Sequence, residues 1–191
     1  MKGRLEMANA IVVLARGFEE IEALTVIDVL RRAGIETVTA ALGQSDRVLG
    51  AHGIEVKADA LFADASKDDY DVVILPGGGE GTENLKASEA LANRLRRQRD
   101  EDGLIAAICA APTVLVEADV LEPGQHVTCY PSCVIDLDRP SANVPVVEDG
   151  NVITGQAPGS AMLFALVIVS RLLGEKAAHK VARGLVTDVM D

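Results

Sequence analysis

One cysteine follows directly on a short apolar segment. Residues 104–108 form an uninterrupted apolar run typical of a buried strand, and Cys109-Ala-Ala-Pro112 comes next. A nucleophile at a sharp strand-to-helix turn is held above the edge of a sheet, close to free backbone N–H groups. Such groups and the dipole of a following helix favour a thiolate, so we expect a lowered pKa for Cys109. The alternative is that Cys109 is a small buried apolar residue, a common fate of a lone cysteine.

A glycine turn follows a different apolar run. Residues 71–75 read as an interior strand, and Pro76-Gly-Gly-Gly79 comes after it. Because the carboxyl ends of parallel strands meet in one crevice, the amides of this turn can face Cys109 and bind a developing oxyanion. A turn that needs positive φ would account for one or two of these glycines without any function. The run has neither a dinucleotide fingerprint nor the Lys-Ser/Thr of a phosphate loop, which argues against nucleotide binding.

Acidic residues open the first predicted helix, immediately after the first predicted strand. Glu22 of Glu19-Glu-Ile-Glu22 shares a helical face with Val26 and Val29, so it should point inward. A buried carboxyl without a nearby cation tends to keep its proton and can then donate a hydrogen bond to a thiolate. Acidic residues in a first helical turn also compensate the helix dipole, and that reading stays open for the group as a whole.

The remaining nucleophiles and histidines give no strong motif. His126, Cys129 and Cys133 lie near one another in sequence, but a zinc site needs four well-placed ligands and no second pair follows, so no metal site is predicted. His52 and His179 are isolated and read as surface or interface groups. No serine stands in a Gly-x-Ser-x-Gly elbow, which leaves a serine hydrolase without support.

Short β-branched runs alternate with amphipathic stretches along the whole chain, the pattern of a parallel sheet with helices on both faces. The predicted strands are 10–14, 37–42, 71–75, 104–108, 126–129 and two short strands within 144–154, with 50–59 as a strand or hairpin off the main sheet. The predicted helices are 19–33, 88–99, a short one after Pro112, 158–173 and 175–190. The strand ends therefore gather the cysteine, the glycine turn and the acidic helix start.

Composition limits the class of protein. The 191 residues, 49% of them hydrophobic, suffice for one core and predict a single domain over 1–191. A net charge of −11 argues against binding to nucleic acids or anionic membranes. The apolar run 10–15 is too short for a signal peptide or a membrane span. Three cysteines without framework spacing indicate a reducing compartment, so we expect a cytoplasmic protein.

Four motifs occur together and in order: Gly17-Phe-Glu-Glu-Ile-Glu22, Leu75-Pro-Gly-Gly78, Ala106-Ala-Ile-Cys-Ala-Ala-Pro112 and Ala157-Pro-Gly159. In this set the chain resembles the ThiJ/PfpI superfamily from about residue 9 to about residue 189, and in particular the branch of the parkinsonism-associated protein deglycase and bacterial YajL. The resemblance implies an α/β fold, a flavodoxin-like three-layer sandwich with a mostly parallel central sheet and a cysteine nucleophile elbow, in a single class I glutamine amidotransferase-like domain. It implies no cofactor.

The resemblance also assigns roles by position. It makes Cys109 the nucleophile, Glu22 the buried acid hydrogen-bonded to it, and the amides of Gly78 and Ala110 the oxyanion hole. Other positions that it implicates are Gly77, Tyr130 and Pro158 as residues lining the site, and Arg32 and His52 near the interface of a homodimer.

Two positions depart from relatives. The peptidase-like branch has a histidine directly after the cysteine, and Ala110 stands there, which disfavours proteolysis. The deglycase branch often has a histidine where this chain has Tyr130, which can donate a hydrogen bond but is a poor base near neutral pH.

Two functional hypotheses use the same residues. The first is a cofactor-free glyoxalase or deglycase in which the Cys109 thiolate attacks a small reactive dicarbonyl or an early adduct on a glycated protein. The alternative is a redox-sensing or chaperone-like stress protein in which Cys109 is oxidised to a sulfinate that Glu22 stabilises. Neither hypothesis requires a metal or a cofactor.

Overall fold

The computed structural model describes residues 7–190 and is built around one mostly parallel sheet of seven strands. The strands of this sheet are β1 (Asn9–Leu14), β2 (Glu36–Ala41), β5 (Ala60–Leu61), β6 (Val72–Leu75), β7 (Leu104–Ile108), β8 (Val146–Asp149) and β9 (Val152–Gly155). They lie in the order β5-β2-β1-β6-β7-β9-β8, and only β8 runs antiparallel to its neighbour. A separate hairpin of β3 (Arg47–Leu49) and β4 (Glu55–Lys57) lies off the main sheet, as predicted, but its first strand precedes the predicted range 50–59.

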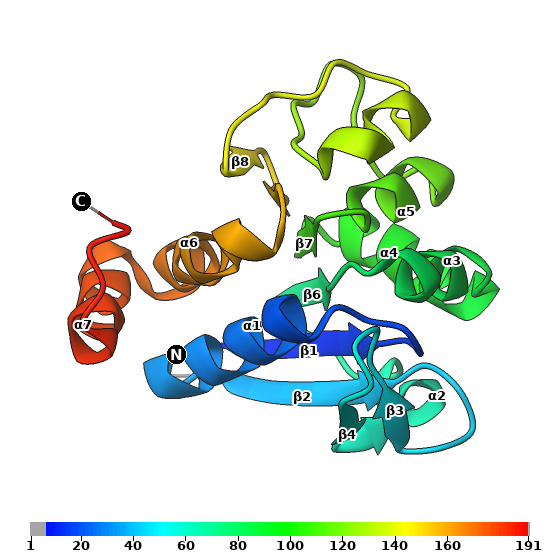
Figure 1. Cartoon of the computed structure of the whole chain (residues 1–191), viewed down its shortest axis with the longest axis horizontal. Helices are drawn as coiled ribbons and strands as arrows, with labels where there is room; N and C mark the ends of the chain where they lie inside the picture. Colours follow the sequence, from blue (N-terminus) through cyan, green and yellow to red (C-terminus); the bar gives the residue numbers. More distant parts are fainter. Residues whose placement is uncertain (1–6, 191) are drawn as a thin grey trace, which may run out of the picture.

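Helices cover both faces of the sheet (Figure 1). The α-helices are α1 (Glu20–Ala33), α2 (Phe62–Ala65), α3 (Gly79–Lys86), α4 (Glu89–Asp100), α5 (Pro112–Glu117), α6 (Ala161–Leu173) and α7 (Glu175–Leu185). Two 3₁₀ helices, η1 (Pro131–Asp136) and η2 (Pro158–Ser160), lie in the loops. The three-layer α/β architecture expected from the sequence is confirmed. No helix within residues 7–190 is long and apolar enough to cross a bilayer.

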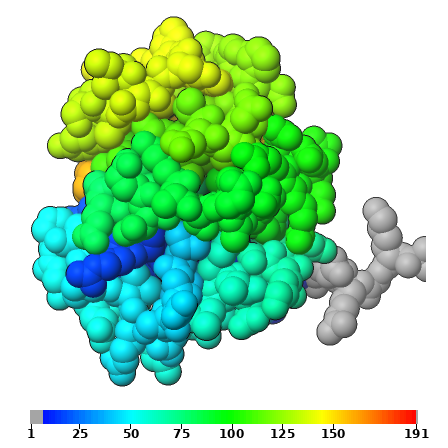
Figure 2. All heavy atoms as spheres, turned by 90° about the vertical axis from the view of Figure 1, so that its right-hand side faces the viewer, coloured from blue at the N-terminus to red at the C-terminus, as the bar shows by residue number. Residues whose placement is uncertain are grey.

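The alternation of side chains along β1 divides the interior into two cores. Ala10, Val12 and Leu14 pack with α1, α6 and α7 on one face. Ile11 and Val13 pack with apolar side chains of α2, α3, α4 and α5 on the other face. Figure 2 views the molecule from the side on which α3 and α4 lie between the β3–β4 hairpin below and residues 120–145 above. Both faces of β1 are therefore fully buried, as in other parallel sheets.

One predicted strand is absent. Residues 126–129 form only an isolated bridge, between Val127 and Ser141, and are otherwise irregular. The reason is that the Thr128 amide donates to the side-chain oxygen of Thr154 at 2.9 Å instead of to a backbone ladder. The sequence reading also omitted α2, α3 and the two-residue strand β5, which are short and have little apolar periodicity.

The strand order determines where a site can form. The chain passes from β1 to β2 on one side of β1, whereas β6 lies on its other side. Ligand-binding crevices in such sheets form beyond the carboxyl ends of the strands at this reversal. The loop from β1 to α1, the glycine turn after β6 and Cys109 after β7 all lie at that edge.

Candidate active site

Cys109 has a strained backbone, as expected for a nucleophile elbow. Its φ is 65°, in the left-handed region that non-glycine residues rarely adopt. Two backbone hydrogen bonds hold this conformation: its N–H donates to the Gly155 carbonyl at 2.9 Å, and its carbonyl accepts from the Tyr130 N–H at 2.8 Å. The side chain is buried and α5 begins three residues later. The fold therefore fixes the direction of the thiol.

Glu22 lies in the first turn of α1 and is fully buried. The carboxylate of Glu19, the N-cap residue, accepts a hydrogen bond from the Glu22 amide at 2.8 Å and so fixes the start of the helix. The Gly77 amide donates to Oε2 of Glu22 at 2.7 Å. The other oxygen, Oε1, is buried and accepts no hydrogen bond from any described nitrogen or oxygen. A proton on Oε1 that faces the sulfur would account for this oxygen.

Two of the three glycines in the turn, Gly77 and Gly78, are required by close packing. A Cβ on Gly77 would lie 2.7 Å from the Cys109 Cβ and 2.8 Å from Oε2 of Glu22. Gly78 has a φ of 95°, and a Cβ there would lie 2.3 Å from the Gly17 carbonyl oxygen. The turn is thus pressed between the start of α1 and the cysteine elbow, which brings Glu22 and Cys109 together.

The pKa values of this pair are raised. Burial raises the pKa of Glu22 to about 7, partly offset by hydrogen bonds from Gly77 and the Cys109 thiol. Burial and then the Glu22 charge raise the pKa of the Cys109 thiol, and the amides of Ala110 and Gly78 lower it by less. The lowered pKa expected from sequence is therefore wrong, because burial and the Glu22 charge outweigh the amides on which that expectation rested.

A Cys109 thiolate beside an ionised Glu22 would place two anions in contact within a buried crevice, where they repel strongly. Cys109 and Glu22 therefore act as one coupled pair that retains a shared proton near neutral pH. When that proton is on Glu22, the thiolate is accompanied by a neutral carboxyl and by the amides of Gly78 and Ala110. This state is the one that can perform nucleophilic chemistry.

Of the other predicted site residues, some lie beside Cys109 and Glu22 and others do not. The Tyr130 backbone contacts the elbow directly, and its side chain is exposed. Pro158 opens η2, three residues after Gly155, whose carbonyl binds the Cys109 amide. Arg32 lies on the last turn of α1 with its side chain paired to Asp28, far along the helix from Glu22.

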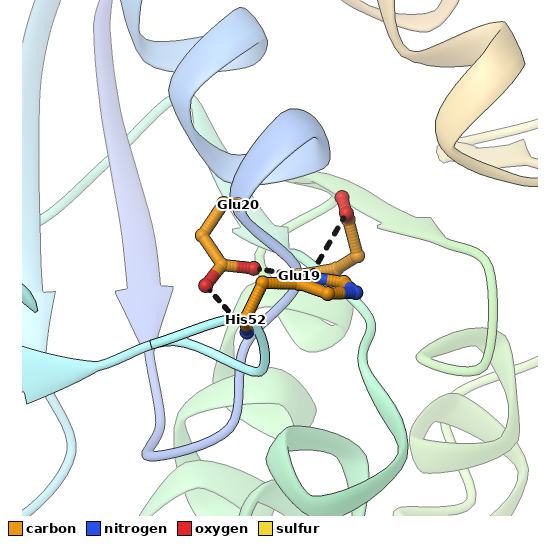
Figure 3. Close-up of side chains that lie close together, drawn as sticks. All are labelled: Glu19, Glu20 and His52. Carbon is orange, nitrogen blue, oxygen red and sulfur yellow. Dashed lines mark hydrogen bonds and ion pairs between the residues drawn. The ribbon is translucent and has the colours of Figure 1, made fainter. Parts of the chain in front are cut away.

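The side chains that could bind a metal in the structure are not the ones considered in the sequence analysis. Nδ1 of His126 contacts Asp149 at 3.0 Å, and no described group joins it to Cys129 or Cys133. Within residues 7–190, the side chains whose ligand atoms converge are Glu19, Glu20 and His52 (Figure 3). Sequence reasoning missed this group because His52 arrives from the β3–β4 hairpin, more than thirty residues further along the chain.

Comparison with known proteins agrees with the geometry. The model of the DJ-1/PfpI family matches residues 8–171. The chain belongs to this family. It is 42% identical to the Drosophila melanogaster protein dj-1beta over 180 residues, which cover 93% of this chain and 96% of that protein. The solved structure of oxidised Toxoplasma gondii DJ-1 superposes with a TM-score of 0.91 at 34% identity, covering 95% of this chain and 99% of that one.

A further family member carries the name of an activity. The Caenorhabditis elegans glutathione-independent glyoxalase DJR-1.2 is 32% identical over 170 residues, which cover 87% of this chain and 89% of that protein.

The packing of the glycine turn gives a first prediction. Gly77→Ala should lower the free energy of unfolding by about 1–3 kcal/mol, because its methyl group overlaps Cys109 and Glu22. Gly79→Ala is the matched control, since no atom lies within 4 Å of its Cβ position, and it should be neutral or slightly stabilising. Urea denaturation measures both. Equal stability of the two variants would contradict the close packing described for Gly77.

Ionisation of Glu22 predicts a pH-dependent stability. Its carboxyl keeps a proton in the fold up to about pH 7 but ionises near 4.5 in the unfolded chain, so stability falls as pH rises through this window. The pKa difference corresponds to about 3 kcal/mol. Glu22→Gln cannot ionise and should lose this component of the pH dependence, as measured by denaturation between about pH 4.5 and 8. The exposed Glu83→Gln is the control and should keep it.

Proposed function

We propose that the protein is a cofactor-free cysteine enzyme that converts reactive dicarbonyls, free or as early adducts on proteins, into hydroxy acids. The observation that carries this proposal is the contact of the Cys109 thiol with a fully buried carboxyl whose pKa is raised to about 7. Such a carboxyl can give and take a proton near neutral pH. The name of the related C. elegans glyoxalase is consistent with the same chemistry.

The first step is addition. The Cys109 thiolate attacks the aldehyde carbon of a 2-oxoaldehyde, forming a C–S bond while the carbonyl π electrons move to oxygen. Amides of Gly78 and Ala110, which in the free protein face the sulfur, supply hydrogen-bond donors at the reacting centre. Protonation of the oxyanion by Glu22 gives a hemithioacetal.

The second step moves a proton between adjacent carbons. Ionised Glu22 removes the proton from the former aldehyde carbon, and the resulting enediol is reprotonated on the neighbouring carbon. The aldehyde carbon is thereby oxidised to a thioester and the ketone carbon is reduced to an alcohol, so no external redox agent is required. Water then cleaves the thioester, which releases a 2-hydroxy acid and regenerates the thiol.

Methylglyoxal provides the direct test, because lactate is the expected product. Cys109→Ser should abolish lactate formation, since the nucleophile is lost. Glu22→Gln should lower turnover by about 10²–10⁴-fold while leaving Cys109 open to alkylation by iodoacetamide. Cys133→Ser, a partly exposed cysteine outside the pair, is the matched control and should keep wild-type turnover.

Alkylation distinguishes the two roles of Glu22. Gln removes the carboxylate charge that raises the pKa of Cys109, so the thiol of this variant should ionise at lower pH than a thiol beside ionised Glu22. Full turnover in Glu22→Gln would assign Glu22 a structural role only, and lactate formation by Cys109→Ser would overturn the proposal.

Oxidation of Cys109 is the second candidate function. The related Toxoplasma gondii DJ-1 was solved in an oxidised form. Here a thiolate would react with one peroxide to give a sulfenate and water, and with a second to give a sulfinate, beside the neutral Glu22 carboxyl. All three cysteines are free, as suits a protein of the reducing cytoplasm, where we propose it acts. Sulfinate formation at low peroxide without methylglyoxal turnover would favour this function over the enzyme.

We further propose that the protein forms a homodimer through the outer face of α1. Its other face packs on α6, yet Ile21 is 57% and Leu24 39% exposed, and Ile54 beside β4 is 52% exposed. Apolar side chains gathered on an exposed helix are typical of an interface. Arg32 and His52 lie near the two ends of α1, so this dimer would bring both toward the contact.

Light scattering tests the assembly. The wild-type protein should be a dimer at micromolar concentration, and Leu24→Asp should be a monomer because it buries a charge in the contact. Ile135→Asp changes an apolar side chain that is 88% exposed on η1 and should remain a dimer. A monomeric wild-type protein at this concentration would contradict the proposed dimer interface.

A further inference from the structure

Two cysteines that the proposed reaction does not use lie in the loop between α5 and β8, at the top of Figure 1. Cys129 is buried, whereas Cys133 in η1 is partly exposed, and both are free thiols. The sequence analysis considered them only as metal ligands. Within residues 7–190, no group of three converging ligand atoms includes either sulfur, so their role has to be sought in the chemistry of the thiols themselves.

The backbone of Tyr130 brings the two cysteines toward each other. Its carbonyl oxygen accepts a hydrogen bond from the Cys129 thiol at 3.3 Å and another from the Cys133 amide at 2.8 Å. One oxygen thus lies between the sulfur of one cysteine and the backbone of the other. The thiols are also within electrostatic range of each other, because burial raises the pKa of Cys129 most and a negative charge on Cys133 raises it further.

The two thiols share their surroundings with each other and not with the reactive cysteine. Cys129 and Cys133 pack with the apolar side chains of α2, α3, α4 and α5 on one face of the sheet. Cys109 contributes to the core on the other face, with α1 and α6. The sheet also separates the two thiols from the outer face of α1, where we place the dimer contact. Cys133 is therefore the natural partner of Cys129.

We propose that Cys129 and Cys133 form a reversible disulfide by exchange with a small-molecule disulfide such as glutathione disulfide. The partly exposed Cys133, as its thiolate, attacks one glutathione sulfur, which forms a mixed disulfide and releases one glutathione thiolate. Cys129 then loses its proton and attacks the Cys133 sulfur, and the second glutathione leaves as a thiolate that takes up this proton. Two protein thiols are thereby oxidised to one disulfide, and the external disulfide is reduced to two thiols.

The short loop keeps this bond reversible. A disulfide joins two sulfurs at about 2.05 Å with a restricted dihedral angle, so the turn around Tyr130 must adjust to close it. A disulfide formed under such strain is more easily reduced, and disulfides in a reducing compartment are usually transient. The pair therefore returns to the free thiols when the external disulfide is removed.

Thiol counting in the Cys109→Ser variant tests the proposal without any measurement of turnover. The substitution removes the active-site thiol, so Cys129 and Cys133 are the cysteines that remain to respond. The folded variant is incubated with glutathione disulfide and then unfolded in iodoacetamide. Both thiols should be lost to alkylation, and the mass of the chain should fall by two hydrogens. Dithiothreitol should restore both thiols.

Single substitutions in the same background are the matched controls, and circular dichroism verifies the fold of each. Cys129→Ser should retain glutathione as a mixed disulfide on Cys133, because the second attacking sulfur is gone. Cys133→Ser should keep a free Cys129 thiol, because that side chain is buried. A mixed disulfide that persists in Cys109→Ser, a disulfide between two chains, or two thiols that remain free would overturn the proposal.

Discussion

The hydrogen bond from the Gly77 amide to the buried Glu22 carboxyl is the contact on which the site depends. It joins the helix after β1 to the turn after β6, and Cys109 after β7 packs against both. A carboxyl removed from water without a cation needs strong donors or a proton. Here one oxygen has the amide and the other has no nitrogen or oxygen donor, so the protonation state of Glu22 and the chemistry of the sulfur are linked.

The same contact explains why packing and reactivity cannot be separated at this edge of the sheet. Any side chain at position 77 would move either the carboxyl or the thiol. The capping of α1 by Glu19 has a similar double role, because the residue that caps the start of the helix also raises the pKa of Glu22. The start of α1, the turn after β6 and the elbow after β7 thus share the positioning of two reactive groups, and none of these segments forms the site alone.

Local sequence patterns predicted the parts of this arrangement that depend on local structure. The apolar run 104–108 coincides with β7, and helical spacing alone directed Glu22 inward. Segments whose structure depends on residues far away in the sequence were harder to predict. Residues 126–129 have β-forming side chains, but Thr128 bonds to the side chain of Thr154 rather than to a strand. The predicted direction of the Cys109 pKa shift was wrong for a different reason: the prediction counted the amides near the thiol but not the cost of burying its charge or the repulsion by an ionised Glu22. The approach of His52 to Glu20 likewise depends on how the hairpin folds back.

The left-handed backbone of Cys109 makes the thiol costly to the stability of the fold. A residue with a Cβ in that conformation costs the fold about 1–2 kcal/mol relative to glycine, and the φ of 65° is maintained by surrounding hydrogen bonds rather than by any preference of cysteine. Glycine would adopt this conformation without that cost, so the chain keeps a nucleophile at this turn at the expense of some stability.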